Sequence, residues 1–431
     1  MYEMEIKPNS KNFKILQLSN AWDIASGYGV QSRGSLFEWN KHYDVRQLAM
    51  YGNEGRMRAF RNPSDPTDKN WLKVYPTLVG DQYGDRTAQL IFKRSKWKPD
   101  LFITLYDIWM GAYVEPANTL DGFKPIHPYW IPIVMVDHDP VPELTLMSAK
   151  VAYRVVTPTK FGEEQFKRRG VRAWHIPFGV DTKTYQPLPE RRKLKTFLHQ
   201  RTIPFDMDNA TAITEDSFVI MINGANKDPY RKAFMRMFTA IQIFLMNNPD
   251  AVKDTRFYVH SWMKQARDIP HGAKVLFIQQ YGRGTDDLHN LCGVPEDVMA
   301  QLYNSADVFM HLSEGGGFEI PILEALSCGV PVIGSDFVGM GDLIRDHGWA
   351  VPMKTRYFSQ LDALQGIADE YKAADALEEA YNHPEKREAY GKAGREFALG
   401  FDYSKVNAQW IEFFEDIRSE TGYKPLEARV L

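Results

Sequence analysis

Cysteine is scarce in this sequence, and so are the segments that would direct it out of the cell. The 431 residues include only Cys292 and Cys328, too few for the disulfide framework that supports small secreted domains. Both lie among apolar neighbours, which predicts buried free thiols in a reducing compartment. The N-terminus, MYEMEIKPNSKNFK, is acidic and polar, without the apolar core of a signal peptide. These absences favour a cytoplasmic protein.

Long apolar runs are also missing. The run Ile131–Val136 is interrupted by Pro132 and falls far short of the roughly 18 residues that cross a bilayer. This argues against a membrane-spanning helix. Peripheral contact with a membrane through an amphipathic patch remains an open alternative.

Neither sign of charge dominates. Lys and Arg number 52 against 55 Asp and Glu, for a formal net charge of −3. That balance argues against a protein whose main affinity comes from neutralising a phosphate backbone, although a local basic cleft stays compatible with it. A chain of 431 residues with 44% apolar and 25% charged residues is typical of a globular protein of two domains.

Strand-like apolar runs alternate with helical patterns along the chain. We expect strands at Phe13–Ser19, Leu101–Leu105, Ile131–Val136, Tyr153–Thr157, Phe218–Ile222, Arg256–His260, Val275–Ile278, Val308–Leu312 and Pro331–Ile333. Between two of them, apolar residues from Phe234 to Leu245 recur at helical spacing. Strands separated by helices predict parallel sheets with right-handed crossovers. The expected fold class is therefore α/β, with two Rossmann-like, doubly wound domains.

The stretch from Pro187 to Glu215 marks the expected domain boundary. It holds several prolines and the basic run Arg191–Lys195 and shows no sustained period, which favours a solvated linker. We expect an N-terminal domain over 1–190, a C-terminal domain over 191–400 and a final segment over 401–431. Within that segment, Tyr403–Ile417 has the pattern of an amphipathic helix.

The most informative motif is Ser313–Asp336, SEGGGFEIPILEALSCGVPVIGSD. An expected strand runs into Gly315-Gly316-Gly317, and a helix is expected from Glu319 to Gly329. Glycines let the backbone approach a ligand closely, and a helix start offers unpaired N–H groups with a partial positive charge. The combination predicts a diphosphate site, with Glu324 within reach of ribose hydroxyls. The alternative is a plain tight turn with an exposed glutamate.

The residues around this loop resemble glycosyltransferase family 4, a group of retaining enzymes of GT-B fold that are like glycogen synthase and phosphatidylinositol mannosyltransferase. The likeness is carried, in the family's order, by Phe318, Pro321, Leu323-Glu324-Ala325, Cys328-Gly329, Pro331-Val332 and Ser335-Asp336. Val294–Met310 and Pro177–Asp181 resemble other segments of the family. The resemblance implies that Glu324 binds the ribose and that amides near Gly316, Gly317 and Phe318 hold the distal phosphate. It also implies two domains facing a central cleft, with the last helix crossing back to the N-terminal domain.

The sequence departs from the family at Gly316. The family has a glutamate there, which contacts the donor sugar and supports charge at the reacting carbon. Glu314 and Glu319 flank the position, and either is a candidate to replace it. Glu319 is the favoured candidate because it is closer to the phosphate loop.

Three cations precede the first helix of the second half: Lys227, Arg231 and Lys232. Departure of a nucleoside diphosphate builds negative charge on the leaving oxygen, and fixed cations lower that barrier. Ordinary surface charges are the alternative, but cations at a helix start oppose the helix dipole and so favour a bound anion. In the resemblance, Lys232 matches the family's lysine and Lys227 takes the place of its arginine.

His138 follows an expected strand within Asp137-His138-Asp139. Residues at the carboxyl ends of parallel strands point into the ligand crevice. A structural histidine is one alternative, and a metal site is another, although successive side chains rarely converge on one ion. The family has a His-Asp here, so the resemblance implies that His138 orients the donor sugar. Gly27 and Gly29 correspond to the family's glycine loop under the diphosphate.

Together with the resemblance, these residues predict a retaining transferase that moves a hexose from a UDP- or GDP-sugar to an acceptor hydroxyl. We expect no cofactor beyond the nucleotide sugar and no metal. The expected catalytic residues are His138, Lys232 and Glu319, and the expected donor-binding residues are Gly27, Gly29, Lys227, Arg231, Glu314, Gly316, Gly317, Phe318 and Glu324. An epimerase or hydrolase on the same fold and a non-catalytic sugar-nucleotide or glycan-binding module are the competing hypotheses. The acceptor stays open among glycans, lipids, proteins and modified nucleic acids.

Overall fold

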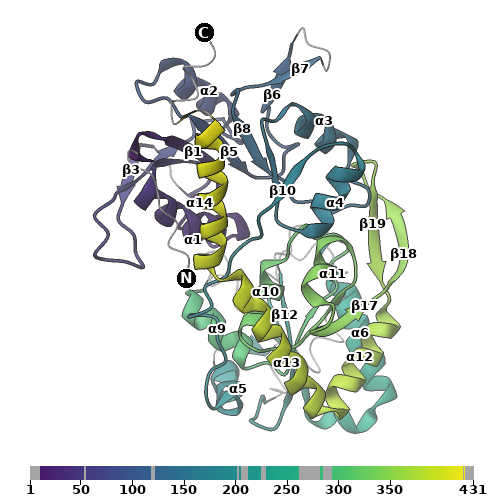
Figure 1. Cartoon of the computed structure of the whole chain (residues 1–431). Coiled ribbons are helices and arrows are strands. Elements are labelled where there is room, and N and C mark those ends of the chain that lie inside the picture. The colour runs from purple at the N-terminus through teal and green to yellow at the C-terminus, as the bar shows by residue number, and fades with distance from the viewer. Residues whose placement is uncertain are drawn as a thin grey trace. The chain divides into compact units, whose positions relative to one another are not determined.

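The structure is a computed structural model that describes residues 10–52, 55–117, 122–200, 203–204, 212–224, 230–261, 282–284, 294–420 and 422. The chain divides into two compact units (Figure 1). Unit 1 comprises Met1–Val136, Val141–Gly179 and Tyr403–Leu431, and unit 2 comprises Asp137–Pro140 and Val180–Asp402. The sequence had placed the domain limits after residues 190 and 400. The short segment Asp137–Pro140 therefore belongs with the second unit, although it lies within the first half of the sequence.

Unit 1 is built around an eight-stranded sheet of order β10-β9-β8-β5-β1-β2-β4-β3. Its strands are β1 (Lys14–Ser19), β2 (Asp44–Ala49), β3 (Arg58–Phe60), β4 (Leu72–Pro76), β5 (Leu101–Leu105), β8 (Trp130–Ile133), β9 (Val155–Thr157) and β10 (Ala173–His175). Neighbours run parallel except for β3, which pairs antiparallel with β4. A further hairpin joins β6 (Val114–Pro116) to β7 (Phe123–Pro125). The central strands β1 and β5 are buried almost throughout, as apolar strands covered on both faces of a parallel sheet must be.

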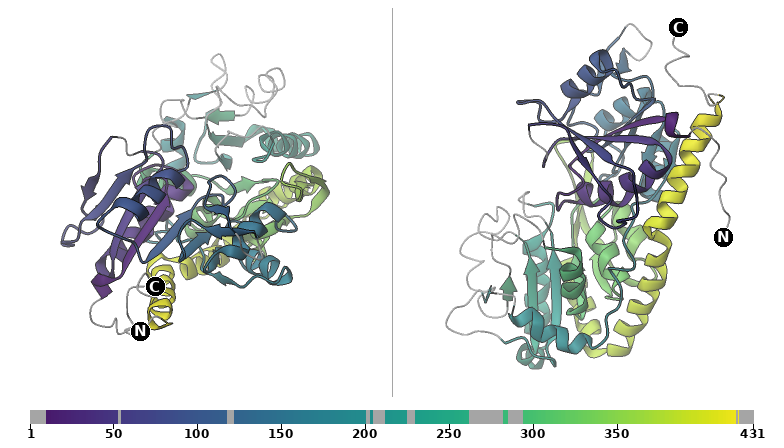
Figure 2. Two further views of the ribbon diagram at one scale, coloured as in Figure 1. Left: turned by 90° about the horizontal axis from the view of Figure 1, so that it is seen from above. Right: turned by 90° about the vertical axis from the view of Figure 1, so that its left-hand side faces the viewer.

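The helices of unit 1 follow the strands as a doubly wound sheet requires. They are α1 (Gly27–His42), α2 (Asp85–Arg94), α3 (Glu143–Val151), α4 (Lys160–Arg168) and α14 (Tyr403–Glu420), with the short 3-10 turn η1 (Ser10–Asn12). The C-terminal α14 lies beside α1 (Figures 1 and 2), with the Trp39 ring 5.0 Å from Trp410 and 5.1 Å from Phe414. A Cβ on Gly34 would overlap the ring of Tyr403, so the close approach of the two helices requires glycine there. The last helix is thus part of unit 1, as the resemblance implied.

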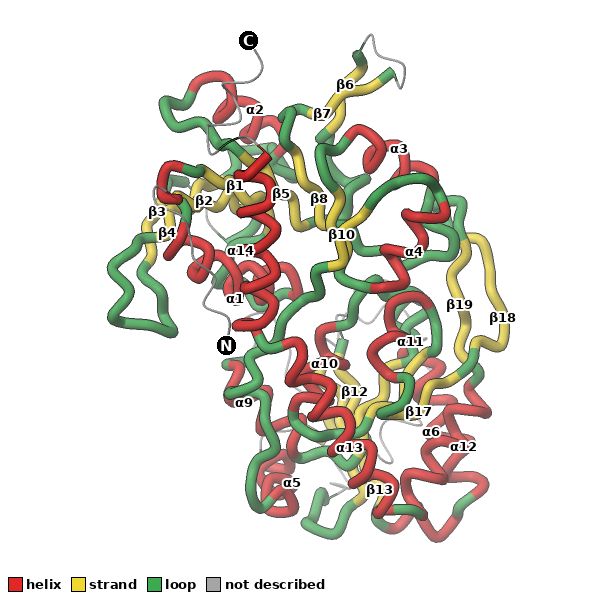
Figure 3. The backbone as a smooth tube through the Cα atoms, viewed as in Figure 1, coloured by secondary structure: helices red, strands yellow, loops and turns green. Residues whose placement is uncertain are grey.

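Unit 2 holds a seven-stranded sheet of order β11-β14-β13-β12-β15-β16-β17. Its strands are β11 (Ile203–Pro204), β12 (Phe218–Asn223), β13 (Thr255–His260), β14 (Gly282–Gly284), β15 (Val308–His311), β16 (Val332–Ser335) and β17 (Gly348–Val351). All neighbours run parallel except β11, which is antiparallel to β14. The separate hairpin of β18 (Met353–Phe358) and β19 (Leu364–Ala368) follows β17 (Figure 3).

The helices of unit 2 are α5 (Arg191–Gln200), α6 (Phe234–Asn247), α9 (Glu296–Asn304), α10 (Ile320–Ser327), α11 (Val338–Ile344), α12 (Glu370–Asn382) and α13 (Pro384–Ala398), with the 3-10 turns η2 (Pro249–Lys253) and η3 (Leu399–Phe401). The apolar face predicted for α6 is buried against the sheet, from Phe234 to Leu245. Each expected strand within the described residues overlaps an observed one. The strand expected at Val275–Ile278 lies outside the described residues.

One expectation is wrong. The basic run Arg191–Lys195 is not a solvated linker but the start of helix α5. Arg191 donates to the carbonyls of Asn304, Ala306 and Gly329 at 3.1 to 3.2 Å, and buried Lys195 donates to Ser217 O at 2.6 Å. These cations satisfy backbone carbonyls that are distant in sequence, which a local charge pattern cannot reveal.

Within the described part of the chain, no helix combines the length and the apolar character needed to cross a membrane.

Candidate functional site

The glycine loop lies between β15 and α10 and is buried over its whole length, from His311 to Ile320. Helix α10 begins at Ile320 with Glu319 as its N-cap, and it ends before Gly329, whose φ of 69° is the left-handed value expected of a glycine that follows a helix. Ser313 Oγ and Glu314 N both donate to Arg231 O, at 2.9 and 2.8 Å. The loop is thereby tied to the segment that carries the predicted cations.

Lys232, whose side chain is 11% exposed, forms an ion pair with the buried Glu319 at the start of α10. The Lys232 Nζ atom lies 2.7 Å from each carboxylate oxygen of Glu319, and Arg231 Nη1 lies 4.0 Å from Oε1. Burial by itself would raise the pKa of Glu319, but the charge of Lys232 and the nearby His311 outweigh it and hold that pKa well below its usual range. Burial lowers the pKa of Lys232, and the Glu319 charge offsets this in part. The carboxylate therefore stays ionised next to a cation, at the positive end of a helix.

Gly316 leaves the space that Glu319 occupies. A Cβ atom on residue 316 would lie 2.5 Å from Glu319 Oε1 and 2.7 Å from its Cγ. A side chain at 316 and the present position of Glu319 exclude each other. The structure thus brings the Glu319 carboxylate to the place where a side chain of residue 316 would begin.

Glu314 has a different setting. It is 4% exposed, accepts a hydrogen bond from Arg236 Nε at 3.0 Å, and accepts another from the Tyr357 hydroxyl at 2.6 Å. Both carboxylate oxygens are therefore held by side chains from α6 and β18. This arrangement suits a residue that fixes the loop, and it favours Glu319 over Glu314 as the glutamate next to Gly316.

Glu324 lies on α10 and is also buried. Its Oε2 accepts from the Tyr303 hydroxyl at 2.9 Å, and that hydroxyl accepts from Asn223 Nδ2, also at 2.9 Å. Burial, together with the Glu324 charge, raises the pKa of Tyr303, so the tyrosine remains a proton donor. The chain Asn223–Tyr303–Glu324 orients the carboxylate on its helix.

His138 belongs to unit 2 and is 3% exposed. Its Nδ1 lies 2.7 Å from Asp137 Oδ1, a pairing that orients the ring. The segment that carries it lies directly against the glycine loop, because a Cβ on Gly315 would be 2.6 Å from the carbonyl oxygen of Asp137. The structure brings His138 and the glycine loop into one unit, although they are far apart in sequence.

The remaining predicted residues are placed as follows. Gly317 and Phe318 lie in the same buried loop, before α10. Gly27 and Gly29 belong to unit 1 at the start of α1. Lys227 lies outside the described residues. Among the residues that are described, no group of three or more His, Cys, Asp or Glu is arranged to hold a metal ion.

Sequence reasoning missed several side chains in this region: Asn223, Arg236, Tyr303, His311 and Tyr357. His311 is the clearest case, because its Nε2 lies 3.4 Å from Glu319 Oε2 and its side chain is 2% exposed. Its place at the end of an expected strand, before the glycines, was a usable signal. Tyr357 gave none, because nothing in its local pattern indicates a partner on the glycine loop.

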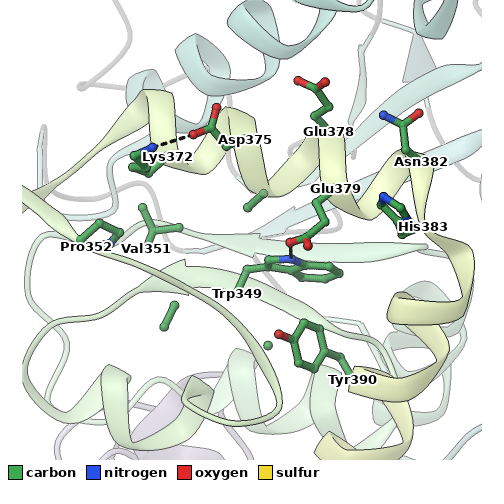
Figure 4. Close-up of a pocket in the computed structure, with 13 residues that line it drawn as sticks. Trp349, Val351, Pro352, Lys372, Asp375, Glu378, Glu379, Asn382, His383 and Tyr390 are labelled. Atoms are coloured by element: carbon green, nitrogen blue, oxygen red, sulfur yellow. Dashed lines mark hydrogen bonds and ion pairs between the residues drawn. The ribbon is translucent and has the colours of Figure 1, made fainter.

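A separate cavity of about 660 Å³ lies between β17, α12 and α13 (Figure 4). Four of its polar side chains form pairs: Trp349 Nε1 donates to Glu379 at 2.6 Å, and Lys372 pairs with Asp375 at 2.9 Å. None of the predicted site residues lines it. The candidate site is therefore the charged region around the glycine loop, and this cavity is not part of it.

One comparison with known proteins covers this part of the chain. Residues 229–367 match the family model for glycosyl transferases group 1. The matched segment is therefore similar to the group 1 glycosyltransferases. It contains the candidate cations Arg231 and Lys232, the glycine loop and Glu324, and it ends within β19.

One curated relative is the O-antigen chain mannosyltransferase B of Escherichia coli, which is 40% identical over 68 residues, or 15% of this chain and 18% of the relative. The match covers well under two thirds of that protein. Two solved structures are similar over nearly the whole chain. Sucrose-phosphate synthase from Thermosynechococcus elongatus has a TM-score of 0.66 at 16% identity, covering 95% of this chain and 100% of the other. HepE from Anabaena, in complex with UDP and glucose, has a TM-score of 0.62 at 13% identity, covering 94% and 100%.

These structures confirm the fold. The chain has the GT-B fold of glycosyltransferases, with two Rossmann-like units. This agrees with the fold class predicted from the sequence. The resemblance noted around the glycine loop is likewise confirmed by the family match.

Proposed function

We propose that this protein is a retaining glycosyltransferase that moves a hexose from a UDP- or GDP-sugar to an acceptor hydroxyl. The observation that carries the proposal is the pairing of Lys232 with the buried Glu319 at the start of α10, beside Gly316. The carboxylate of Glu324 and the imidazole of His138 lie in the same unit. The name of the E. coli relative, a mannosyltransferase, and the UDP and glucose of the HepE complex support a nucleotide-sugar donor.

The cations and the helix start would hold the leaving diphosphate. Lys232 and Arg231 approach the start of α10 from one side, and the amides of Gly316, Gly317 and Phe318 precede that helix. Fixed donors of this kind stabilise the charge that develops as the sugar–phosphate bond breaks. They supply positive charge without a metal ion, and we propose that none is required.

The other residues would bind the two ends of the donor. Glu324, oriented by Tyr303, would accept hydrogen bonds from the ribose hydroxyls. His138, oriented by Asp137, would bind the sugar. Glu319 would take the part of the glutamate that related enzymes carry at position 316, supporting positive charge at the reacting carbon.

In the proposed reaction, the bond between the anomeric carbon and the diphosphate oxygen breaks while the acceptor oxygen bonds to the same face of that carbon. The acceptor proton passes to the departing phosphate oxygen, so charge and atoms balance without a separate protein base. His138 is therefore assigned to sugar orientation and not to proton abstraction. The anomeric configuration is retained because bond formation and cleavage share one face.

The test is release of the nucleoside diphosphate, without acceptor, from a panel of UDP-, GDP-, ADP- and TDP-sugars. We expect slow release from one donor and a loss of affinity for it of about tenfold or more in Glu324→Gln, because a hydrogen bond to a charged group is lost. Glu388→Gln, an exposed carboxylate on α13, is the matched control and should behave as wild type. The proposal is wrong if no donor is bound or cleaved.

A donor that binds without any release, with or without acceptors, would instead support a sugar-nucleotide-binding module. The observation that favours this second function is the glycine at position 316, where the family has a glutamate. Formation of an epimerised sugar in the same assay would indicate an epimerase on this fold, and formation of a free sugar at a high rate would indicate a hydrolase.

A further inference from the structure

The hairpin of β18 and β19 belongs to neither sheet of the two units (Figure 3). Its strands pair antiparallel: Met353 lies opposite Ala368 at the base, and Phe358 lies opposite Leu364 near the tip. Phe358 is 72% exposed, which identifies the tip as a surface feature. Residues of both strands nevertheless contact two segments of the candidate site.

The first contact is with the segment that carries His138. Asp139 N donates to Leu364 O at 3.0 Å, and Leu364 N donates to Asp139 O at 3.1 Å. These two bonds form a small antiparallel bridge. The ion pair between Arg356 and Asp139, at 3.0 Å, is half exposed and adds little. The backbone bridge therefore holds the residue next to His138 against β19.

The second contact is with the glycine loop. Gly366 N donates to Glu314 O at 2.9 Å, and the Tyr357 hydroxyl donates to Glu314 Oε2 at 2.6 Å. Gln365 lies against the next residue, since a Cβ on Gly315 would be 3.0 Å from its Nε2. Backbone and side chain of Glu314 are thus both held by the hairpin.

The hydrogen bond from the Tyr357 hydroxyl matters because the Glu314 carboxylate that accepts it is buried. Glu314 is 4% exposed, and its other carboxylate oxygen is taken by Arg236. A buried carboxylate that loses one donor is left undersatisfied, and the surrounding loop must shift or admit water. The position of the glycine loop therefore depends on a hydroxyl from the hairpin.

We propose that the hairpin of β18 and β19 holds the His138 segment and the glycine loop in the relative position that binds the donor sugar, with Tyr357 as its positioning residue. This inference rests on the proposed function. Glu324 and Lys232, the residues assigned to ribose and diphosphate, are held by partners outside the hairpin. Loss of the Tyr357 hydroxyl should therefore impair recognition of the sugar far more than recognition of the nucleotide.

The experiment compares Tyr357→Phe with wild type by calorimetric titration with UDP, GDP, UDP-glucose and GDP-mannose. Tyr357→Phe removes only the hydroxyl and keeps the ring. We expect unchanged affinity for the free nucleotide that wild type binds and about tenfold weaker binding of the matching nucleotide sugar. Phe358→Ala, at the exposed neighbouring position, is the control and should match wild type for both ligands.

A second measurement needs no ligand. Hydrogen–deuterium exchange of the free protein should be faster in Tyr357→Phe at the amides of Asp139 and Gly366, which donate to Leu364 and Glu314. Equal weakening of nucleotide and nucleotide sugar, or unchanged affinities together with unchanged exchange, would overturn the hairpin proposal. Failure of wild type to bind any of the four ligands would overturn the proposed function, and the exchange result would still decide whether the hairpin orders the two segments.

Discussion

Each unit has glycines at the point where a parallel strand is followed by a helix, and the surroundings of these glycines differ between the two units. In unit 1, Gly29 lies in the first turn of α1 and is enclosed by nearby residues: Gly29 N donates to Ser26 Oγ at 3.1 Å, and a Cβ on Gly29 would overlap the carbonyl of Ile24. In unit 2, a side chain on Gly316 would collide with a carboxylate that is paired with Lys232.

The difference shows that glycine spacing alone does not distinguish packing from ligand binding. Gly29 is required by the close approach of backbone to backbone, a structural need. Beside the loop of unit 2, the chain buries Glu319 and His311 and covers most of Lys232, and burying charge is costly unless it is paired. The candidate site therefore differs from the glycine-containing first turn of α1 in its cluster of charged side chains, and not in its glycines.

The largest effect is expected for Lys232→Ala. It removes the cation assigned to the leaving diphosphate, so donor cleavage should fall by about 10²- to 10³-fold. It also removes the nearest partner of the buried Glu319 carboxylate, which should lower the free energy of unfolding by about 3–5 kcal/mol. Lys193→Ala, at a residue 64% exposed on α5, is the control. Replacing both partners, in Lys232→Met with Glu319→Gln, should restore most of the stability and none of the activity; recovered activity would contradict the assignment.

The next prediction exchanges the glutamate between positions 316 and 319. Glu319→Ala should slow donor cleavage by about 10²-fold, the usual effect of losing one stabilising group. Adding Gly316→Glu to that variant should recover part of the rate, because the space beside residue 316 is then free. Gly316→Glu alone should destabilise unit 2, since the two side chains would overlap. Initial rates and melting temperatures of the three variants decide it, and a double variant no faster than Glu319→Ala would show that Glu319 does not replace the side chain at 316.

Gly29→Ala tests the comparison from the side of unit 1. Its methyl group would collide with Ile24, so we expect a loss of stability of up to about 3 kcal/mol, as for other overpacked positions. Nucleotide affinity, measured well below the melting temperature, should not change. Gly400→Ala is the control, because a Cβ there meets nothing within 4 Å. Weaker nucleotide binding at unchanged stability would instead support the predicted role of Gly29 under the diphosphate.

The smallest effect concerns one histidine in each unit, His127 and His260. Burial lowers the pKa of His127 in unit 1 and of His260 in unit 2 from 6.5 to about 4. The unfolded chain therefore binds more protons than the folded one between these values, and stability should fall as the pH drops from 6.5 towards 4. At pH 5 the loss per histidine is about 2 kcal/mol.

His127→Gln and His260→Gln should each remove that share of the pH dependence. Urea unfolding of both variants and wild type at pH 7 and pH 5 provides the measurement. Equal pH dependence in a variant and in wild type would show that the histidine is not held neutral. Unequal effects of the two variants would show that the two units differ in this respect as well.

Much of the fold was predictable because its signals are local. The apolar runs of β1 and β5, the helical spacing from Phe234 to Leu245 and the glycine that ends α10 are each set by residues near one another in the chain. The basic run Arg191–Lys195 was misread for the complementary reason. Its cations bind carbonyls of residues remote in sequence, such as that of Gly329, and no local pattern reports such partners.

The same division applies to the candidate site. The sequence by itself determined the alternation of strands and helices, the glycine loop and the types of charged residue near it. Only the tertiary structure decided that Glu319 and not Glu314 lies beside Gly316, that His311 approaches it, and that the hairpin of β18 and β19 contacts both the His138 segment and the loop. The physical reason is that backbone patterns depend on neighbours in sequence, whereas the partners of a buried charge come from wherever the fold brings a compensating group.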